Sequence, residues 1–248
     1  WFQPTEHTRG PWDAANCHAG PPTGLIARAV EILLPEQRLT RLTVNLYRPV
    51  PFDGFSIEAK ITRQGRTVCT AAARVLDKHG KEVVNATSMH LSPAEPQVLA
   101  TQRRSIGSPE NAVDGAFPLR KTLHGLPAFN GEGVQVRYPT GHTGEPGPTV
   151  AWMRTVPLLA HEEPSPFQKI CPLADCGNAF GRNAEPHDVT FMNTDLTVLL
   201  HREPIGEWLG SDSISYWETD GTGMADAQLF DHQGCVGRAL QTLLLRQN

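Results

Sequence analysis

Two polar side chains that could act on a water molecule stand in largely apolar runs of the C-terminal half. Gln241 lies in a run dominated by alanine and leucine (239–244), and Asp195 directly precedes another apolar run. An aspartate can orient and partly deprotonate water, and a glutamine amide can hold the same water without carrying charge. The ordinary Asp pKa of about 3.9 makes a weak base at neutral pH, so partial burial would help. A salt bridge or a structural hydrogen bond is the alternative for either residue.

A second candidate group is the segment His18-Ala19-Gly20, which precedes a predicted helix. Backbone N–H groups at a helix start carry about half a positive charge and can stabilise an oxyanion. Gly20 would let a ligand approach the backbone closely. A local hydrogen-bonding role is the alternative for His18.

Other reaction chemistries lack their motifs in this sequence. There is no GxSxG elbow of a serine hydrolase, no HExxH zinc motif, and no Walker A or GxGxxG pattern. The 10 histidines are scattered rather than clustered. We therefore expect neither a metal nor a cofactor.

Composition indicates a globular protein with a substantial core. The chain has 248 residues, of which 39% are hydrophobic and 19% charged. A net charge of −4 argues against general nucleic-acid binding, and no apolar run approaches the roughly 18 residues that a membrane span requires. The 5 cysteines form no CxxC pair, which favours a reduced, cytoplasmic protein. Arginine outnumbers lysine, which is compatible with a bacterial source.

The N-terminal half, residues 1–95, predicts one helix followed by antiparallel strands. Apolar residues recur at helical spacing from Leu25 to Leu34 after Pro21-Pro22, and Pro35 ends the run. Four strands with a hairpin turn at Asp77–Gly80 are predicted at Leu39–Arg48, Phe55–Thr62, Thr67–Leu76 and Val83–Leu91. This order predicts an α+β fold.

Residues 96–132 have little periodicity and predict a linker, after which residues 133–248 repeat the plan. A helix is predicted from Ser165 to about Phe180, with a kink near Pro172. The predicted strands are Val134–Tyr138, Thr149–Val156, Val189–Arg202, Glu207–Trp217, Met224–Phe230 and Val236–Arg246.

The two halves match each other at an offset of 154 positions. Leu42–Arg48 aligns with Leu196–Arg202, and the turn Asp77–Gly80 aligns with Asp231–Gly234. At this offset Asp195 falls on Arg41 and Gln241 on Thr87. The first half thus lacks both candidate groups, so we expect one site per chain.

Three stretches carry a resemblance to a known family. They are Cys17–Pro22, Asp195–Arg202 with the following Glu207–Leu209, and Phe230–Gly234 with Gln241. In order, spacing and duplication the chain resembles the TesB-like (type II) acyl-CoA thioesterases. The resemblance implies a double hotdog, in which two antiparallel sheets each wrap a central helix.

The resemblance also implies site residues and a substrate. In this family an Asp, a Gln and a hydroxyl residue order the attacking water, and Asp195 and Gln241 match the first two. The hydroxyl position falls on Tyr216, or on Ser215 if the register shifts by one; such a slip reverses the face, so both cannot serve. His18, Ala19 and Gly20 match the family's entry to its first helix. The implied partner is acyl-CoA, and homo-oligomers are possible.

Two other functions stay open on the sequence alone. One is a non-catalytic module that binds acyl-CoA or lipid, because the expected threonine is missing. The other is a hotdog enoyl-CoA hydratase, which needs an Asp and a His in one site. Asp195 and His201 lie on one predicted strand, about 20 Å apart at 3.3 Å per residue, which argues against that pairing.

Overall fold

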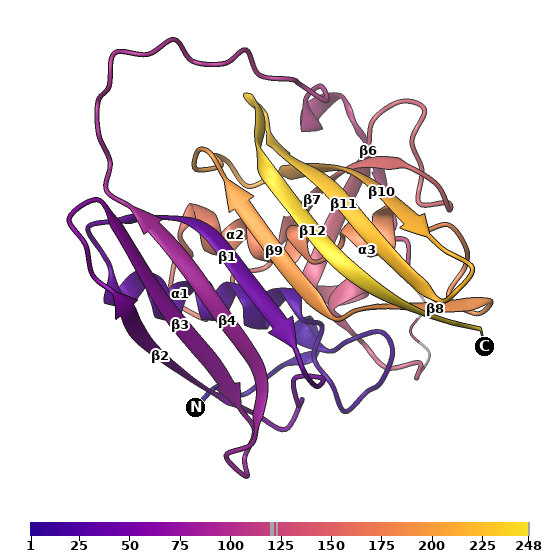
Figure 1. The fold of residues 1–248 in the computed structure, drawn as a ribbon. Coiled ribbons are helices and arrows are strands. Elements are labelled where there is room, and N and C mark those ends of the chain that lie inside the picture. The colour runs from indigo at the N-terminus through magenta and orange to yellow at the C-terminus, as the bar shows by residue number, and fades with distance from the viewer. Residues whose placement is uncertain (120–121, 123, 248) are drawn as a thin grey trace.

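The computed structural model describes residues 1–119, 122 and 124–247. Within that part of the chain, 12 antiparallel strands form one sheet, and the helices pack against a single face of it (Figure 1). The strand order is β2-β3-β4-β1-β9-β12-β11-β10-β7-β6-β5, and β8 pairs with β12. The double hotdog fold expected from the sequence is confirmed.

The N-terminal half places one helix inside four strands, as predicted. Proline at the first helical turn costs no hydrogen bond, because those N–H groups have no partner within the helix. The helix buries Ile26, Ala27 and Val30 against the sheet. The elements are η1 (Glu6–Thr8), α1 (Gly20–Leu33), β1 (Arg38–Leu46), β2 (Ser56–Arg63), β3 (Val68–Leu76) and β4 (Glu82–Leu91).

The C-terminal half repeats this plan around a broken helix. Ser165 caps the helix start by accepting from the Gln168 N–H at 3.2 Å. The helical elements are α2 (Pro166–Ala174) and α3 (Gly177–Phe180), and the strands are β6 (Val134–Tyr138), β7 (Thr149–Thr155), β8 (Val189–Asn193), β9 (Asp195–Leu200), β10 (Leu209–Trp217), β11 (Thr222–Asp231) and β12 (Gly234–Gln247).

The two halves meet along the antiparallel pair β1–β9, which joins their strands into a single sheet rather than two. Thr43 pairs with Thr197, and their hydroxyls lie 3.2 Å apart. These threonines are each other's counterparts at the offset of 154, so a pseudo-twofold axis passes between them. The helices α1 and α2 lie beside each other under this junction (Figure 1).

The β11–β12 hairpin of the second copy is one residue shorter than the β3–β4 hairpin of the first copy. Ala73 pairs with Ala86 in the first half, whereas its counterpart Ala227 pairs with Ala239. Gln241 therefore corresponds to the buried Ser88 and not, as the ungapped alignment predicts, to Thr87.

The predicted strand Val189–Arg202 is two strands separated at Thr194. Asn193 pairs with Leu243, but Thr197 pairs with Leu240, so the β8–β9 side holds one extra residue. Such a bulge shifts the alternation of side chains between the two faces.

The segment between the halves runs over the surface in an extended arc (Figure 1). Its end is fixed by Arg104, which donates to Asp212 and Gln228 at 2.6 Å each. The predicted linker also contains η2 (Pro109–Asn111), β5 (Val113–Gly115) and the start of η3 (Phe129–Gly133). No helix in the described residues is long and apolar enough to cross a membrane.

Candidate active site

The break between α2 and α3 places a buried carboxylate beneath the N-terminus of α1. Asp175 follows the last residue of α2 and is 4% exposed. Pro172 lies inside α2 and lacks an N–H, which weakens the helix at this point. The Ala179 N–H donates to the carbonyl of Cys176 at 3.0 Å, so the Asp175 carbonyl and the Asn178 N–H are left without a helical partner.

Gln241 fills this break from β12. Its Oε1 accepts the Asn178 N–H at 3.0 Å, and its Nε2 donates to the Asp175 carbonyl at 3.0 Å. Nε2 also lies 3.3 Å from the Asp175 carboxylate. Gln241 is buried, as its position in an apolar strand requires, and both ends of its amide have partners.

Three side chains from three segments surround the Asp175 carboxylate. Its Oδ2 lies 3.0 Å from Nδ1 of His18, in the loop before α1. Its Oδ1 accepts from Nδ2 of Asn193, at the end of β8, at 2.8 Å, and from Gln241 at 3.3 Å. A carboxylate has about four acceptor positions, so room remains for one more donor.

The Asp175 carboxylate borders a cavity of about 350 Å³ that opens to the surface. His18, Ala19, Asn178 and Asn193 also line it, whereas Gln241 lies behind Asp175. The apolar part of the wall is formed by Trp12, Leu46, Val50, Leu119, Met192 and Leu244. A mostly apolar cavity with a few converging polar groups is the usual form of a small-molecule site.

Asp195 does not join this group. Its Oδ1 accepts the backbone N–H of Thr242 at 2.6 Å, where the bulge has disturbed the strand ladder. The carboxylate thus replaces a missing carbonyl acceptor, and Asp195 does not line the cavity. The structure therefore brings Gln241 together with Asp175 and not with Asp195.

Neither residue at the predicted hydroxyl position reaches the Asp175 carboxylate. Tyr216 lies on the outer face of β10 and is 51% exposed. Ser215 faces inward like Gln241, but Ala225 of β11 stands between them. The Ser215 hydroxyl is buried and has no hydrogen-bond partner among the described residues. The Asn193 amide instead contacts the Asp175 carboxylate from the end of β8.

Of the segment His18-Ala19-Gly20, the first two residues line the cavity, whereas Gly20 serves a different contact. A Cβ at Gly20 would stand 2.8 Å from the Cα of Pro172, so the glycine lets α1 approach α2. The Gly20 N–H donates to Nδ1 of His18 at 3.1 Å. Nδ1 cannot accept this proton and also donate to Asp175, so the two contacts exclude each other in any one tautomer.

Two thiols of the described residues lie near these groups: Cys17 lines the cavity, and burial raises its pKa to about 12, whereas Cys176 is fully buried. Its Sγ donates to the Pro172 carbonyl at 3.0 Å and lies 4.0 Å from Nε2 of His18. Burial, with a further contribution from the Asp175 charge, raises the pKa of Cys176 well above its ordinary value. A thiolate nucleophile is therefore disfavoured here.

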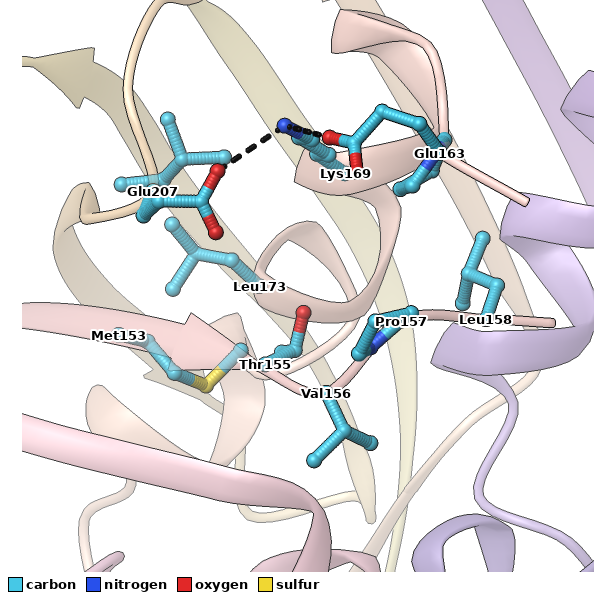
Figure 2. A pocket seen from close by; sticks show the side chains of 11 residues that line it. Met153, Thr155, Val156, Pro157, Leu158, Glu163, Lys169, Leu173 and Glu207 are labelled. Carbon is cyan, nitrogen blue, oxygen red and sulfur yellow. Dashed lines mark hydrogen bonds and ion pairs between the residues drawn. The ribbon is translucent and has the colours of Figure 1, made fainter. Parts of the chain in front are cut away.

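Two other hollows lie apart from the Asp175 carboxylate. A cleft of about 710 Å³ borders Pro21 and Pro22, but neither His18 nor Asp175 lines it. The second hollow, of about 50 Å³, lies beside Lys169, whose ammonium bridges Glu163 at 2.6 Å and Glu207 at 3.1 Å. Figure 2 shows these side chains around it. In the described part of the chain, no group of three or more His, Cys, Asp or Glu side chains could hold a metal ion.

The sequence reasoning missed Asp175 and Asn193. A signal for Asp175 was present, because it is a lone carboxylate among apolar residues of a helix interrupted by proline. Gln241 became a candidate for the same reason, as a polar side chain among apolar residues. Asn193 had no comparable signal, since its inward direction depends on the bulge at Thr194.

Comparison with known proteins identifies the family. Residues 8–91 match the model of the acyl-CoA thioesterase N-terminal domain, and residues 109–245 match that of the C-terminal domain. No curated protein matches the sequence. The fold is similar to three solved structures, each under 20% identical in sequence.

The first is a conserved protein of unknown function with a hot dog fold from Alicyclobacillus acidocaldarius (17% identity, 99% of this chain and 92% of that chain, TM-score 0.75). The second is a tesB protein from Mycobacterium avium subs paratuberculosis (14%, 96% and 91%, 0.70). The third is the acyl-CoA thioesterase II TesB2 from Mycobacterium marinum (18%, 94% and 90%, 0.67). With both halves matched in order, this chain belongs to the acyl-CoA thioesterase family.

Proposed function

We propose that the protein hydrolyses acyl-CoA thioesters to a free acid and CoA, with Asp175 as the base. The observation that carries this proposal is the buried Asp175 carboxylate, which borders the cavity and is held by His18, Asn193 and Gln241. With Nδ1 of His18 protonated, these three donors leave one acceptor position for a water molecule. A base held by packed neighbours can be aimed at one reacting atom.

In the first step, water bound to Asp175 attacks the thioester carbonyl carbon. Asp175 takes one proton as the new C–O bond forms, and the carbonyl oxygen gains negative charge. With Nδ1 of His18 donating to Asp175, the N–H group of Ala19, which lines the cavity, is available to that oxygen. Ala19 directly precedes α1, where the helix dipole favours negative charge.

In the second step the tetrahedral intermediate collapses. The C–S bond breaks, the sulfur leaves with the bonding electrons, and the proton held by Asp175 passes to the thiolate. The products are a carboxylic acid and CoA. This route needs no covalent enzyme intermediate.

The test is a panel of acyl-CoA esters with a thiol-detecting reagent. Asp175→Asn keeps the size of the side chain and removes the base, so kcat should fall by about 10²–10⁴-fold. Asp195→Asn is the matched control, because an amide oxygen can still accept the Thr242 N–H. Equal activity of Asp175→Asn and wild type would refute the role of Asp175. Binding of CoA esters without turnover by wild type would favour the non-catalytic module.

A second candidate is hydration of enoyl-CoA, which the 3.0 Å contact between His18 and Asp175 favours. Hydration also requires an activated water, here added across a C=C bond. The same panel distinguishes the reactions, because hydration consumes the enoyl absorbance without releasing thiol. Thiol release from saturated esters would exclude hydration as the main activity.

A further inference from the structure

The duplication gives each half an arginine at the end of its first strand, and the two have different surroundings. Arg202, after β9, corresponds to Arg48, after β1, at the offset of 154. Both guanidinium ends of Arg202 donate to the Asp231 carboxylate at 2.5 Å. Arg202 also donates to the carbonyl of Gly234 at 2.9 Å. This arginine is thus fully engaged inside the protein.

Arg48 has no such partner, although its half contains the matching aspartate. Asp77 corresponds to Asp231, but among the described residues its carboxylate accepts only from its own turn, the N–H groups of His79 (2.8 Å) and Lys81 (2.9 Å). The Arg48 side chain is exposed, and no described residue forms a hydrogen bond or ion pair with its guanidinium.

A proline in the first half accompanies this difference between the two arginines. The Ile205 N–H donates to Asp231 at 3.0 Å and holds the segment after β9 against the hairpin turn. The residue that corresponds to Ile205 is Pro51, which has no N–H to donate. The segment after β1 instead pairs with the N-terminal segment, through Cys17 N–H to the Val50 carbonyl at 2.8 Å.

In this arrangement of the segment after β1, Arg48 lies at the active-site cavity. Arg48, Tyr47 and Pro49 line the same cavity as Asp175, and Leu46 and Val50 contribute to its apolar wall. An exposed, unpaired guanidinium at such a cavity is a ready phosphate ligand, because its planar N–H groups match two phosphate oxygens.

We propose that Arg48 binds a phosphate of the CoA carrier while the thioester lies at Asp175. This proposal depends on the proposed function in one respect, namely that a CoA ester is the ligand of the cavity. The phosphate has two possible positions: the pyrophosphate, whose pantetheine-side phosphate is shared with carrier proteins, and the 3′-phosphate, which CoA alone carries.

The experiment uses four thioesters of one acyl group: acyl-CoA, acyl-dephospho-CoA, acyl-4′-phosphopantetheine and acyl-pantetheine. Arg48→Ala should raise KM for acyl-CoA by roughly 10- to 100-fold with kcat nearly unchanged, and should leave acyl-pantetheine unaffected. Arg48→Lys should restore part of the loss. Arg66→Ala, which removes an exposed arginine that does not line the cavity, is the charge-matched control.

The substrate at which the effect disappears identifies the phosphate. A loss of the effect in acyl-dephospho-CoA assigns the 3′-phosphate, and an effect that persists in acyl-4′-phosphopantetheine assigns the pantetheine-side phosphate. An equal effect on acyl-pantetheine, or none on acyl-CoA, would overturn the proposal. Calorimetric binding of CoA and pantetheine repeats the comparison without turnover, so failure of the hydrolase proposal and failure of the Arg48 proposal are distinguishable.

Discussion

Arg202 and Arg48 offer a matched test of how a duplicated residue is used. The Arg202–Asp231 pair is largely buried, with 14% of the arginine side chain and none of the aspartate side chain exposed. Removing one partner of a buried pair costs about 3–5 kcal/mol, because the other charge is left without compensation. Asp231 would retain the N–H groups of Ile205 and Gln233, so we expect about 3 kcal/mol for Arg202→Ala.

In a chain of this size, that loss lowers Tm by about 6–12 °C. Arg48→Ala removes an exposed side chain and should change the free energy of unfolding by no more than about 0.5 kcal/mol. Thermal melts followed by circular dichroism measure both variants directly. Equal changes in Tm for the two variants, or an unchanged Tm for Arg202→Ala, would refute this account of the pair.

The pH dependence of stability gives a second test of the Arg202–Asp231 pair. Burial raises the pKa of Asp231, but hydrogen bonds from Arg202, Ile205 and Gln233 outweigh it and hold that pKa below its ordinary value. A lowered pKa means that the stabilisation is complete above the unfolded-state value, about 3.9, and is lost as pH falls through the folded-state value. The Tm difference between wild type and Arg202→Ala should therefore be constant from about pH 5 to 8 and shrink below about pH 4.

Three further predictions concern the packing, the linker and the thiol. Gly20→Ala should destabilise the fold by about 1–3 kcal/mol in urea denaturation, because its Cβ would press on the Pro172 backbone; a neutral result would show that α1 can shift. Limited trypsin treatment should cut first after the exposed Arg103, and the two fragments should co-elute on gel filtration because β1 and β9 stay paired; separate elution would contradict this. Cys176→Ser should keep thioesterase activity within a few-fold, whereas its loss with the fold intact would point to a covalent route.

The regular elements could be predicted because each follows a local rule. The first helix has apolar residues at helical spacing between two proline signals, and the structure places it at Gly20–Leu33. The turns at Asp77 and Asp231 both join antiparallel strands. The continuous sheet was not predicted, because the pairing of β1 with β9 joins segments over 150 residues apart and leaves no local signal.

The directions of two side chains near the site could not be predicted from the pattern of residues alone. Regular alternation from 189 to 202 would put Asn193 and Asp195 on one face of the sheet. The extra residue at Thr194 breaks that phase, so Asn193 turns toward Asp175 while the Asp195 carboxylate caps the Thr242 N–H. A bulge of this kind depends on how two strands pair, which one strand's sequence does not specify.

The groups around Asp175 do not come from a single copy of the repeat. His18 belongs to the first copy, whereas Asp175, Asn193 and Gln241 belong to the second. A copy expressed alone would lack either the imidazole or the carboxylate, however well it folded. Substitutions in either copy are therefore constrained where the two copies contact each other around Asp175. Any reaction at Asp175 depends on the two copies keeping their relative positions.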